Sequence, residues 1–293
     1  MIAASIIVLV GIAAFLVFEW GLRLAGLADY PLYKHVQPEF YRSASSQKGR
    51  FRNRFTWQYD HLGMRSSAEL ESIAGATILV GDSVVDGGMN LDQSETLTSR
   101  VRALTGRTVY PVACHGWSLA NEMLALQAMP EWESAEALVW LINPGDLDNI
   151  TRGDDQFSFP TVRPRLLLPW IFARTVKRHA SYRPLASNPL RDQINKEFRS
   201  KLKSNFVELA NQFLGKIVII EYPMAIEIIP EESFCQNLAA LVEGATLIRL
   251  QELPSWTVDC YFDHIHPNSL GLSLLSEIIQ GALLCPQPNE ATQ

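Results

Sequence analysis

A serine near residue 80 stands in a context that could make it a nucleophile. Ser83 follows the apolar run Ile78–Val80 and the pair Gly81-Asp82. Such a run predicts a buried strand, and Gly81 would permit a sharp turn that exposes the serine at the sheet edge, with backbone N–H groups around it. Because a serine hydroxyl is inert at neutral pH without a base, nucleophilic chemistry also requires a histidine that a carboxylate or a carbonyl positions.

A histidine and an aspartate of the required kind stand near the other end of the chain. Asp263 and His266 directly precede a predicted helix, so a loop there could bring both to the edge that holds Ser83. In that arrangement Ser83 attacks an ester carbonyl, His266 takes its proton and returns it to the leaving alcohol, and Asp263 orients the imidazole. The competing interpretation is a metal site of Asp263, His264 and His266. It is disfavoured because three ligands within four residues cannot easily converge on one ion, so we expect neither a metal nor a cofactor.

Alternating apolar patterns predict an α/β protein around these residues. Five short apolar runs are predicted to be buried parallel strands, with helical spacing of apolar residues between or after them. This alternation favours a doubly wound, flavodoxin-like, three-layer α/β/α fold, whose right-handed crossovers place the loops after the strands along one edge. The predicted strands are Ala76–Val80, Thr108–Ala113, Ala137–Ile142, Lys216–Glu221 and Ala245–Leu250, and the predicted helices are Glu95–Leu104, Asn121–Met129, Gln193–Phe213, Glu232–Val242 and Asn268–Leu283.

The two polar blocks resemble the signature of the SGNH/GDSL hydrolase family, which has a Gly-Asp-Ser nucleophile block near the start and an Asp-x-x-His block near the end. Both are present in that order at Gly81–Ser83 and Asp263–His266, and Pro267–Gly271 is similar to the family's run into its last helix. Upstream, Tyr59–Arg65 resembles the lead-in of membrane-anchored members. The resemblance implies a serine esterase domain, which we place at residues 71–285.

The resemblance also implies three oxyanion donors: the nucleophile's own N–H, a glycine N–H and an asparagine side chain. The first two would be the N–H groups of Ser83 and Gly116, the latter just beyond the second strand. His115 and Trp117 flank Gly116 and are candidates to line the acyl pocket, although Trp117 could equally pack between a strand and a helix.

The third donor departs from the family pattern. The family's Gly-x-Asn-Asp block aligns with Asn143-Pro144-Gly145-Asp146, so glycine stands where the asparagine is expected. Asn143 is the nearest replacement, and Asn149 is a more remote one. Because loss of one oxyanion donor typically lowers turnover by about 10²–10³-fold, the departure implies either a substitute donor or a weaker catalyst.

Residues 1–28 are predicted to be a membrane anchor, in which residues 2–27 contact the bilayer. Ile2–Phe18 is an uninterrupted uncharged run, at the lower limit of a helical span. Glu19 and Arg23 lie one helical turn apart and can pair at the interface. A cleaved signal peptide is the alternative, because Gly26–Ala28 offers small residues for cleavage, but no basic region precedes the apolar run.

Two basic segments do not fit the strand–helix alternation. The basic lead-in, residues 29–70, is expected to be loop-like over residues 34–65, and the insertion at about 151–192 holds seven Lys and Arg and no acid over residues 161–191. The insertion could lie on a membrane, cover the sheet edge as a lid, bind an anionic substrate, or be a helix that packs its apolar residues into the core. Basic residues after the anchor favour a cytoplasmic body, whereas anchored members of the resembled family generally face the periplasm. We expect a periplasmic or otherwise extracytoplasmic body.

Composition excludes several other classes. The 293 residues are 47% hydrophobic, which is typical of a globular protein, and the net charge of −6 argues against a protein that coats nucleic acid. Neither a G-x-G-x-x-G nor a G-x-x-x-x-G-K-[ST] motif occurs, so no nucleotide site is predicted.

Residues 286–293 are expected to be a tail. In an exported body, the four cysteines could pair as Cys235 with Cys260 or Cys114 with Cys285.

These observations favour a serine esterase or deacylase that acts on short O-acyl groups such as acetyl. Anchored relatives often modify cell-envelope polysaccharides, so the resemblance implies an acylated polysaccharide or a small acyl ester as the substrate. An acyltransferase on the same triad is an alternative, because the two differ only in which acceptor reaches the acyl-enzyme. A non-catalytic binding module in polysaccharide assembly is a third reading, motivated by Gly145, although retention of Ser83 and His266 argues against it.

Overall fold

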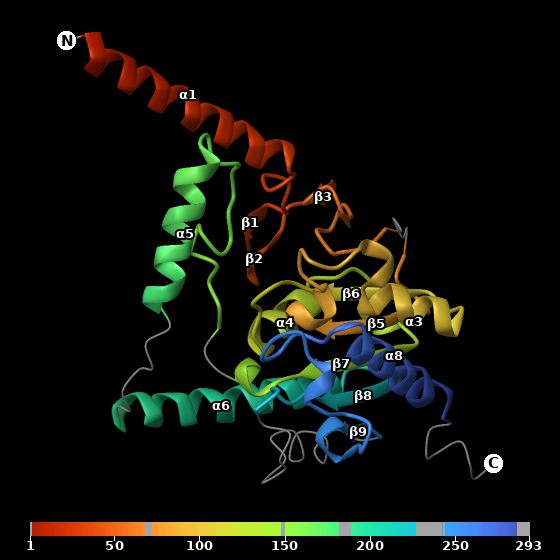
Figure 1. Ribbon diagram of the computed structural model, residues 1–293. Coiled ribbons are helices and arrows are strands. Elements are labelled where there is room, and N and C mark those ends of the chain that lie inside the picture. Colours follow the sequence, from red (N-terminus) through yellow and green to blue (C-terminus); the bar gives the residue numbers. More distant parts are fainter. Residues whose placement is uncertain are drawn as a thin grey trace.

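A five-stranded parallel sheet forms the centre of the protein (Figure 1). The computed structural model describes residues 2–67, 72–147, 150–181, 189–226, 242 and 244–285. The strand order β6-β5-β7-β8-β9 is flavodoxin-like, with the first strand along the chain between the second and the third. Four adjacent pairs are all parallel, which confirms the predicted fold class. The strands are β5 (Thr77–Gly81), β6 (Val109–Ala113), β7 (Ala137–Ile142), β8 (Lys216–Glu221) and β9 (Thr246–Arg249).

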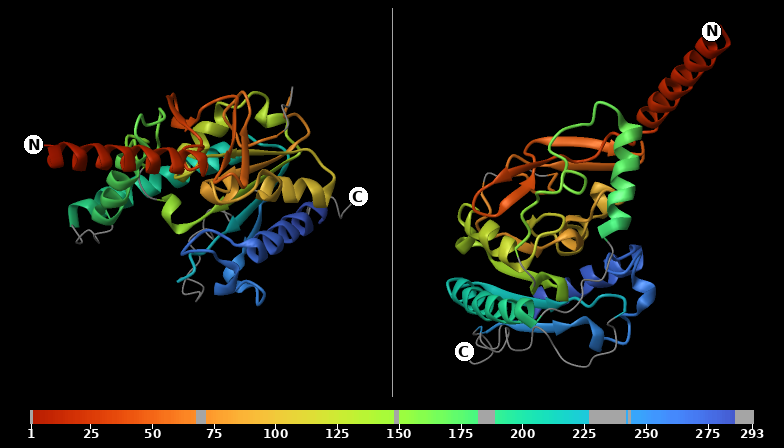
Figure 2. Two further views of the ribbon diagram at one scale, coloured as in Figure 1. Left: turned by 45° about the horizontal axis from the view of Figure 1, so that its top comes forward. Right: turned by 90° about the vertical axis from the view of Figure 1, so that its left-hand side faces the viewer.

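Helices cover both faces of the sheet and give the predicted three layers, which can be followed in Figure 2. On one face α4 (Leu119–Gln127) and α6 (Pro189–Ala210) pack against the strands. On the other face lie α3 (Leu97–Thr105) and α8 (Ser269–Leu284). Successive residues of each central strand alternate between these two apolar cores, which explains why the strands are near-continuous apolar runs in the sequence. Short 3-10 helices connect the elements at η1 (Gln93–Glu95), η2 (Trp132–Ser134), η3 (Pro144–Leu147), η4 (Leu250–Glu252) and η5 (Val258–Cys260).

The lead-in is not a loop, contrary to the expectation from its basic composition. It forms two antiparallel hairpins, β1 (Tyr33–Val36) with β2 (Phe40–Ser43) and β3 (Gln47–Phe51) with β4 (Phe55–Tyr59).

The reason for this error is visible in the second hairpin. Lys48 and Arg50 occupy its exposed positions, while Trp57 and Tyr59 are buried at 2% exposure. The less exposed positions that alternate with Lys48 and Arg50 hold Gln47 and Gly49, which are not apolar, so β3 lacks the alternation of apolar and polar residues that marks a half-buried strand.

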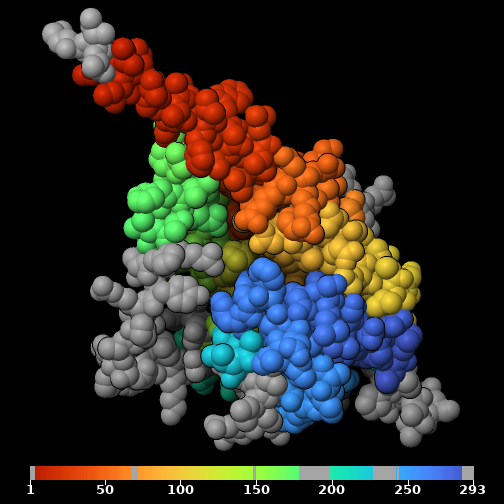
Figure 3. Space-filling model, viewed as in Figure 1, coloured from red at the N-terminus to blue at the C-terminus, as the bar shows by residue number. Residues whose placement is uncertain are grey.

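Helix α1 (Ile2–Leu24) projects from the body, and only its last turns contact other elements (Figure 3). Its segment Ala4–Leu24 has a mean hydropathy of 2.3 and is the one helix among the described residues that is long and apolar enough to cross a membrane. The predicted pair forms, with Nε of Arg23 at 2.8 Å from Oε1 of Glu19. Helix α1 therefore ends in a polar cluster at the surface of the body.

That cluster also fixes the basic insertion. Helix α5 (Leu167–Ser181) begins beside the end of α1, and the Glu19 carboxylate accepts hydrogen bonds from the N–H groups of Leu167 and Leu168 at 2.7 to 2.9 Å. Arg23 also donates to the carbonyl oxygens of Pro164 and Arg165. We call residues 151–181 the strap, because they run from the edge of the sheet to helix α1.

Most sequence-based boundaries are confirmed within a few residues. The predicted helix Glu232–Val242 lies outside the described residues except for Val242, and the predicted tail lies outside them as well. The thiols of Cys114, Cys260 and Cys285 are free, so the suggested Cys114–Cys285 pair does not form. Cys235 lies outside the described residues.

Candidate active site

The turn after β5 fixes Ser83 at the carboxyl edge of the sheet. Ser83 begins the one-turn helix α2 (Ser83–Asp86), and Asp82 caps that helix by accepting a hydrogen bond from the N–H of Val84 at 2.9 Å. A Cβ on Gly81 would lie 2.7 Å from Cγ2 of Val85, so the turn requires glycine, as the sequence predicts. Ser83 is only 5% exposed, but it lines a cavity.

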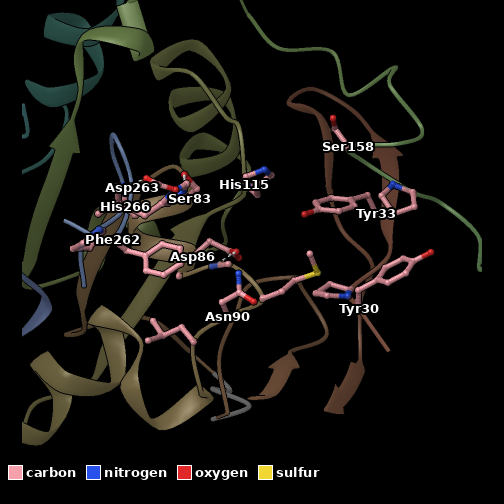
Figure 4. Close-up of a pocket in the computed structure, with 18 of the residues that line it drawn as sticks. Tyr30, Tyr33, Ser83, Asp86, Asn90, His115, Ser158, Phe262, Asp263 and His266 are labelled. Atoms are coloured by element: carbon pink, nitrogen blue, oxygen red, sulfur yellow. Dashed lines mark hydrogen bonds and ion pairs between the residues drawn. The ribbon is translucent and has the colours of Figure 1, made fainter. Parts of the chain in front are cut away.

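Ser83, His266 and Asp263 form a continuous chain of hydrogen bonds at this edge (Figure 4). The Oγ atom of Ser83 lies 2.9 Å from Nε2 of His266, a residue 183 positions away in the sequence. The Nδ1 atom of His266 lies 2.8 Å from Oδ2 of Asp263. This is the geometry in which a histidine can take the serine proton while a carboxylate holds the opposite ring nitrogen.

The Asp263 side chain both holds the loop before α8 and contacts the imidazole of His266. Its Oδ1 accepts the N–H groups of Ile265 and His266 at 2.9 and 2.8 Å, while its Oδ2 meets the imidazole. Partial burial alone would raise the pKa of Asp263, but these hydrogen bonds outweigh it and lower the pKa to about 2. The carboxylate is therefore ionised near neutral pH and favours the tautomer in which Nδ1 carries the ring proton and Nε2 can accept one.

Gly116 lies at the end of the neighbouring strand β6 and has a φ of 75°. A Cβ at this position would lie 3.0 Å from Cζ of Phe159, in a conformation that favours glycine. His115 lines the cavity as suggested, and its ring centroid lies 6.5 Å from that of His266. Trp117 instead is buried and donates its Nε1–H to the carbonyl oxygen of Tyr41 at 2.9 Å, which is the packing alternative.

Asn143 lies behind the nucleophile turn, buried at 4% exposure. Its Nδ2 donates to Oδ2 of Asp82 at 3.2 Å, and its Oδ1 accepts the N–H of Gly145 at 2.9 Å. It is not among the described residues that line the cavity. The structure thus uses one amide hydrogen of Asn143 to hold the cap of the Ser83 helix, and its role as the third oxyanion donor stays a prediction. Asn149 lies outside the described residues.

A second buried group near Ser83 was missed by the sequence reasoning. The carboxylate of Asp86 accepts the hydroxyl of Tyr59 at 3.0 Å and the N–H of Gly88 at 3.3 Å. Burial raises the pKa of Asp86, against the opposing effects of the Arg65 charge and the Tyr59 hydrogen bond. Arg65 also donates to the carbonyl oxygens of Asp86 and Leu91. The only sequence signal was that Tyr59–Arg65 resembles a family lead-in, which does not say what these residues contact.

The alternative metal site is not supported by the geometry. Within the described ranges no group of three or more His, Cys, Asp or Glu side chains could hold a metal ion. Both ring nitrogens of His266 are hydrogen-bonded, and His264 is exposed with its Nδ1 at 4.0 Å from Asp263.

A cavity of about 1100 Å³ opens in front of Ser83. Its walls come from five parts of the chain that are far apart in sequence: the lead-in, the α2 turn, His115 after β6, the strap, and the loop that carries His266 with the start of α8. Figure 4 shows Tyr30 and Tyr33 across the cavity from Ser83 and His266. The cavity is larger than an acetyl ester needs, so it has room for a sizeable alcohol.

The fold and the site together place a serine, a histidine and a carboxylate in hydrogen-bonded line at the carboxyl edge of a parallel α/β sheet, the arrangement that nucleophilic catalysis by serine requires. Neither a family model nor a curated protein matches the chain. Among solved structures the chain is similar to TesA, with 16% identity and a TM-score of 0.42 over 71% of this chain and 98% of that one. It is also similar to the psychrotrophic esterase EstA from Pseudoalteromonas sp., with 12% identity and a TM-score of 0.44 over 71% and 96%. A third is the acetyl xylan esterase Est2A from the rumen bacterium Butyrivibrio proteoclasticus, with 11% identity and a TM-score of 0.40 over 74% and 65%.

Proposed function

We propose that the protein is a serine esterase that removes short O-acyl groups, such as acetyl, from carbohydrate. The observation that supports this most directly is the hydrogen-bonded chain from Ser83 through His266 to Asp263 at the wall of an open cavity. A serine at the end of a buried strand has no structural need for a histidine and an ionised carboxylate in line with its hydroxyl. The chemistry of a nucleophile does need them.

In the proposed reaction, Oγ of Ser83 attacks the ester carbonyl carbon while Nε2 of His266 takes the serine proton. The N–H groups of Ser83 and Gly116, with Asn143 as the third candidate, stabilise the negative charge on the carbonyl oxygen. The tetrahedral intermediate then collapses, and His266 returns the proton to the leaving alcohol. Water, deprotonated by the same nitrogen, attacks the acyl-enzyme and releases the carboxylic acid with regeneration of Ser83.

Labelling with a fluorophosphonate probe tests this proposal, together with hydrolysis of p-nitrophenyl acetate by the full chain in detergent. We expect labelling of the wild type and its loss in Ser83→Ala and His266→Ala. Ser94→Ala is a matched control, because that exposed serine is not among the described residues that line the cavity, and its N–H and hydroxyl groups donate to Asp92. A folded wild-type protein that neither labels nor hydrolyses the ester would overturn the proposal and favour the binding-module alternative.

An acyltransferase remains the second candidate, because the 1100 Å³ cavity has room for an alcohol acceptor beside the acyl-enzyme. The partition of acetyl groups separates the two activities. With p-nitrophenyl acetate as donor, an esterase releases acetate whether or not oligosaccharide is present, whereas a transferase yields acetylated oligosaccharide.

The contacts at the end of α1 support a retained anchor rather than a cleaved signal peptide. Cleavage after Ala28 would remove Glu19, which is 4% exposed and caps α5, and Arg23, which binds two carbonyl groups of the strap. A helix start buried without such a partner is unfavourable. We propose that the protein is anchored with its body outside the cytoplasm. Mass spectrometry of the protein from membranes should find peptides that precede residue 28, and an N-terminus at residue 29 would contradict retention.

A further inference from the structure

Helix α5 of the strap carries a stripe of exposed apolar side chains. Phe172 is 70% exposed and Val176 is 53% exposed, and Pro169 is exposed as well. Steps of three and four residues place these side chains one above the other on one side of the helix. Leu166, just before the helix, is also exposed. An exposed apolar stripe of this kind marks a contact site for a partner or a membrane.

A substrate in the cavity cannot cover this stripe, because the cavity lies on another side of α5. Trp170 stacks on Tyr30, which lines the cavity, with a centroid distance of 5.2 Å. Arg174 and Lys177 follow Trp170 at steps of four and three residues, and both line the cavity. Helical spacing puts these three residues on a different side from the apolar stripe. The helix therefore separates the cavity from whatever contacts the stripe.

The first turn of α5 is fixed beside the last turns of α1. The Glu19 carboxylate accepts the N–H groups of Leu167 and Leu168 at 2.7 to 2.9 Å. The residue after Glu19 is Trp20, which is 64% exposed, and tryptophan is enriched at the level where a spanning helix leaves the hydrocarbon. With the apolar part of α1 in a bilayer, the membrane surface passes close to Glu19 and Trp20, and therefore close to the start of α5.

From that point α5 runs across the direction of α1 rather than along it (Figure 1). Figure 3 shows α1 and α5 adjoining at the margin of the body. A helix that begins at the interface and lies across a spanning helix stays at the depth of the lipid headgroups, where amphipathic helices bury an apolar face. The apolar stripe of α5 provides such a face.

We propose that α5 is an interfacial helix, whose stripe of Pro169, Phe172 and Val176 inserts among the lipids beside α1. This inference rests on the proposed retention of α1 in a membrane and is independent of the esterase activity. A single spanning helix leaves the tilt and rotation of the attached body open, because interfacial contacts help to set them. The second contact, through α5, fixes that orientation and holds the strap wall of the cavity at the membrane surface.

Nitroxide labels on single cysteines test this contact in the full chain, reconstituted into vesicles of phosphatidylethanolamine and phosphatidylglycerol. Two labels are placed on the stripe, at Phe172→Cys and Val176→Cys. Leu9→Cys reports on α1, and Leu214→Cys reports on the aqueous side, because Leu214 is 94% exposed and precedes β8 at the amino edge of the sheet. Buried cysteines stay in the labelled protein, and serine first replaces Cys235 and Cys285.

The relaxation of each label by two reagents gives its surroundings. Oxygen dissolves preferentially in lipid, whereas a charged nickel complex stays in water. We expect oxygen to relax the labels at positions 9, 172 and 176 more strongly than the nickel complex does, and the reverse at position 214. Thermal unfolding checks that each labelled protein keeps its fold.

The label in α1 separates failure of this inference from failure of the anchor. If the label at position 9 lies in lipid while those at 172 and 176 lie in water, the interfacial helix is overturned and the anchor stands. A label at position 9 in water overturns both. Labels at 172 and 176 that are shielded from both reagents overturn the inference in favour of a protein partner or a second copy of the chain. No turnover is measured, so each result holds whether or not the protein hydrolyses esters.

Discussion

Replacement of Asp263 by asparagine would show whether this carboxylate sets the tautomer of His266. Oδ1 of Asp263 accepts the N–H groups of Ile265 and His266, so the asparagine oxygen should stay at that position and its Nδ2 should face Nδ1 of the imidazole. An amide N–H₂ group only donates, so Nδ1 must become the acceptor and the ring proton must move to Nε2. Nε2 is the atom at 2.9 Å from Oγ of Ser83, and once protonated it cannot take the serine proton.

The expected loss is large for a change of so few atoms. A wrong tautomer of this kind lowers kcat by about 10⁴-fold in the well-studied serine protease case, which corresponds to about 5.4 kcal/mol of transition-state stabilisation. The fold should be preserved, because the two backbone hydrogen bonds remain and the Asp263 side chain is 38% exposed. The assay is kcat for p-nitrophenyl acetate and the rate of fluorophosphonate labelling, with thermal unfolding as a check.

Asp259→Asn supplies the control, because Asp259 is an exposed carboxylate in the same loop region with no side-chain role in the triad. We expect it to keep wild-type kcat. A loss of less than about tenfold in Asp263→Asn, at unchanged thermal stability, would refute the assignment of Asp263 as the positioning residue of His266.

Three further predictions concern the pH dependence due to Asp263, the contact of Glu19 with α5, and Gly116. Because the pKa of Asp263 is lowered to about 2, its ionised form stabilises the folded loop fully above about pH 4, and this contribution is lost as the pH falls through about 2. The thermal stability of Asp263→Asn should therefore fall less than that of the wild type between about pH 4 and about pH 2, and an equal fall in both proteins would show that Asp263 does not make this contribution. Glu19→Ala should destabilise the full chain in detergent by about 1–3 kcal/mol, since it removes the cap of α5, whereas the exposed Glu277→Ala on α8 should not change the free energy of unfolding measurably. Gly116→Ala should lower both thermal stability and kcat, because the new Cβ would lie 3.0 Å from Phe159 and the φ of Gly116 is 75°. Gly75→Ala is the control, because Gly75 has a similar φ of 69° but open space around it. Equal effects of the two substitutions on kcat would show that backbone strain, and not the place of Gly116 in the site, is responsible.

Much of the sheet domain could be predicted because its information is local. Strand β7 is a continuous apolar run in the sequence and occupies Ala137–Ile142 as expected, since a strand buried on both faces must be apolar throughout. The pair Asp263 and His266 could be selected with Ser83 because few residue types can activate a hydroxyl. The predicted pairing of Glu19 with Arg23 is equally local, being one helical turn.

The remaining features depend on contacts between segments that are distant in the sequence. Glu19 caps a helix that begins 148 residues later, and Tyr59 at the end of β4 contacts Asp86 of α2 across the intervening strand β5 in the sequence. Asn143 was predicted to face the oxyanion, but a hydrogen bond to Asp82 now uses one of its amide hydrogens. No periodicity or motif encodes these partners, because each depends on how the hairpins and the strap pack onto the sheet.

The sequence by itself therefore determined the class of fold and which three residues are the candidates for a nucleophile and its activating pair, because burial patterns and reaction chemistry restrict which residue types can stand at those positions. Only the tertiary structure decided that Oγ of Ser83 lies 2.9 Å from Nε2 of His266 and that Nδ1 of His266 lies 2.8 Å from Oδ2 of Asp263. It also decided that the lead-in and the strap help to enclose a cavity of about 1100 Å³ in front of Ser83. The physical reason is that a hydrogen-bonded chain and a cavity wall are properties of distances in space, which separations along the chain do not specify.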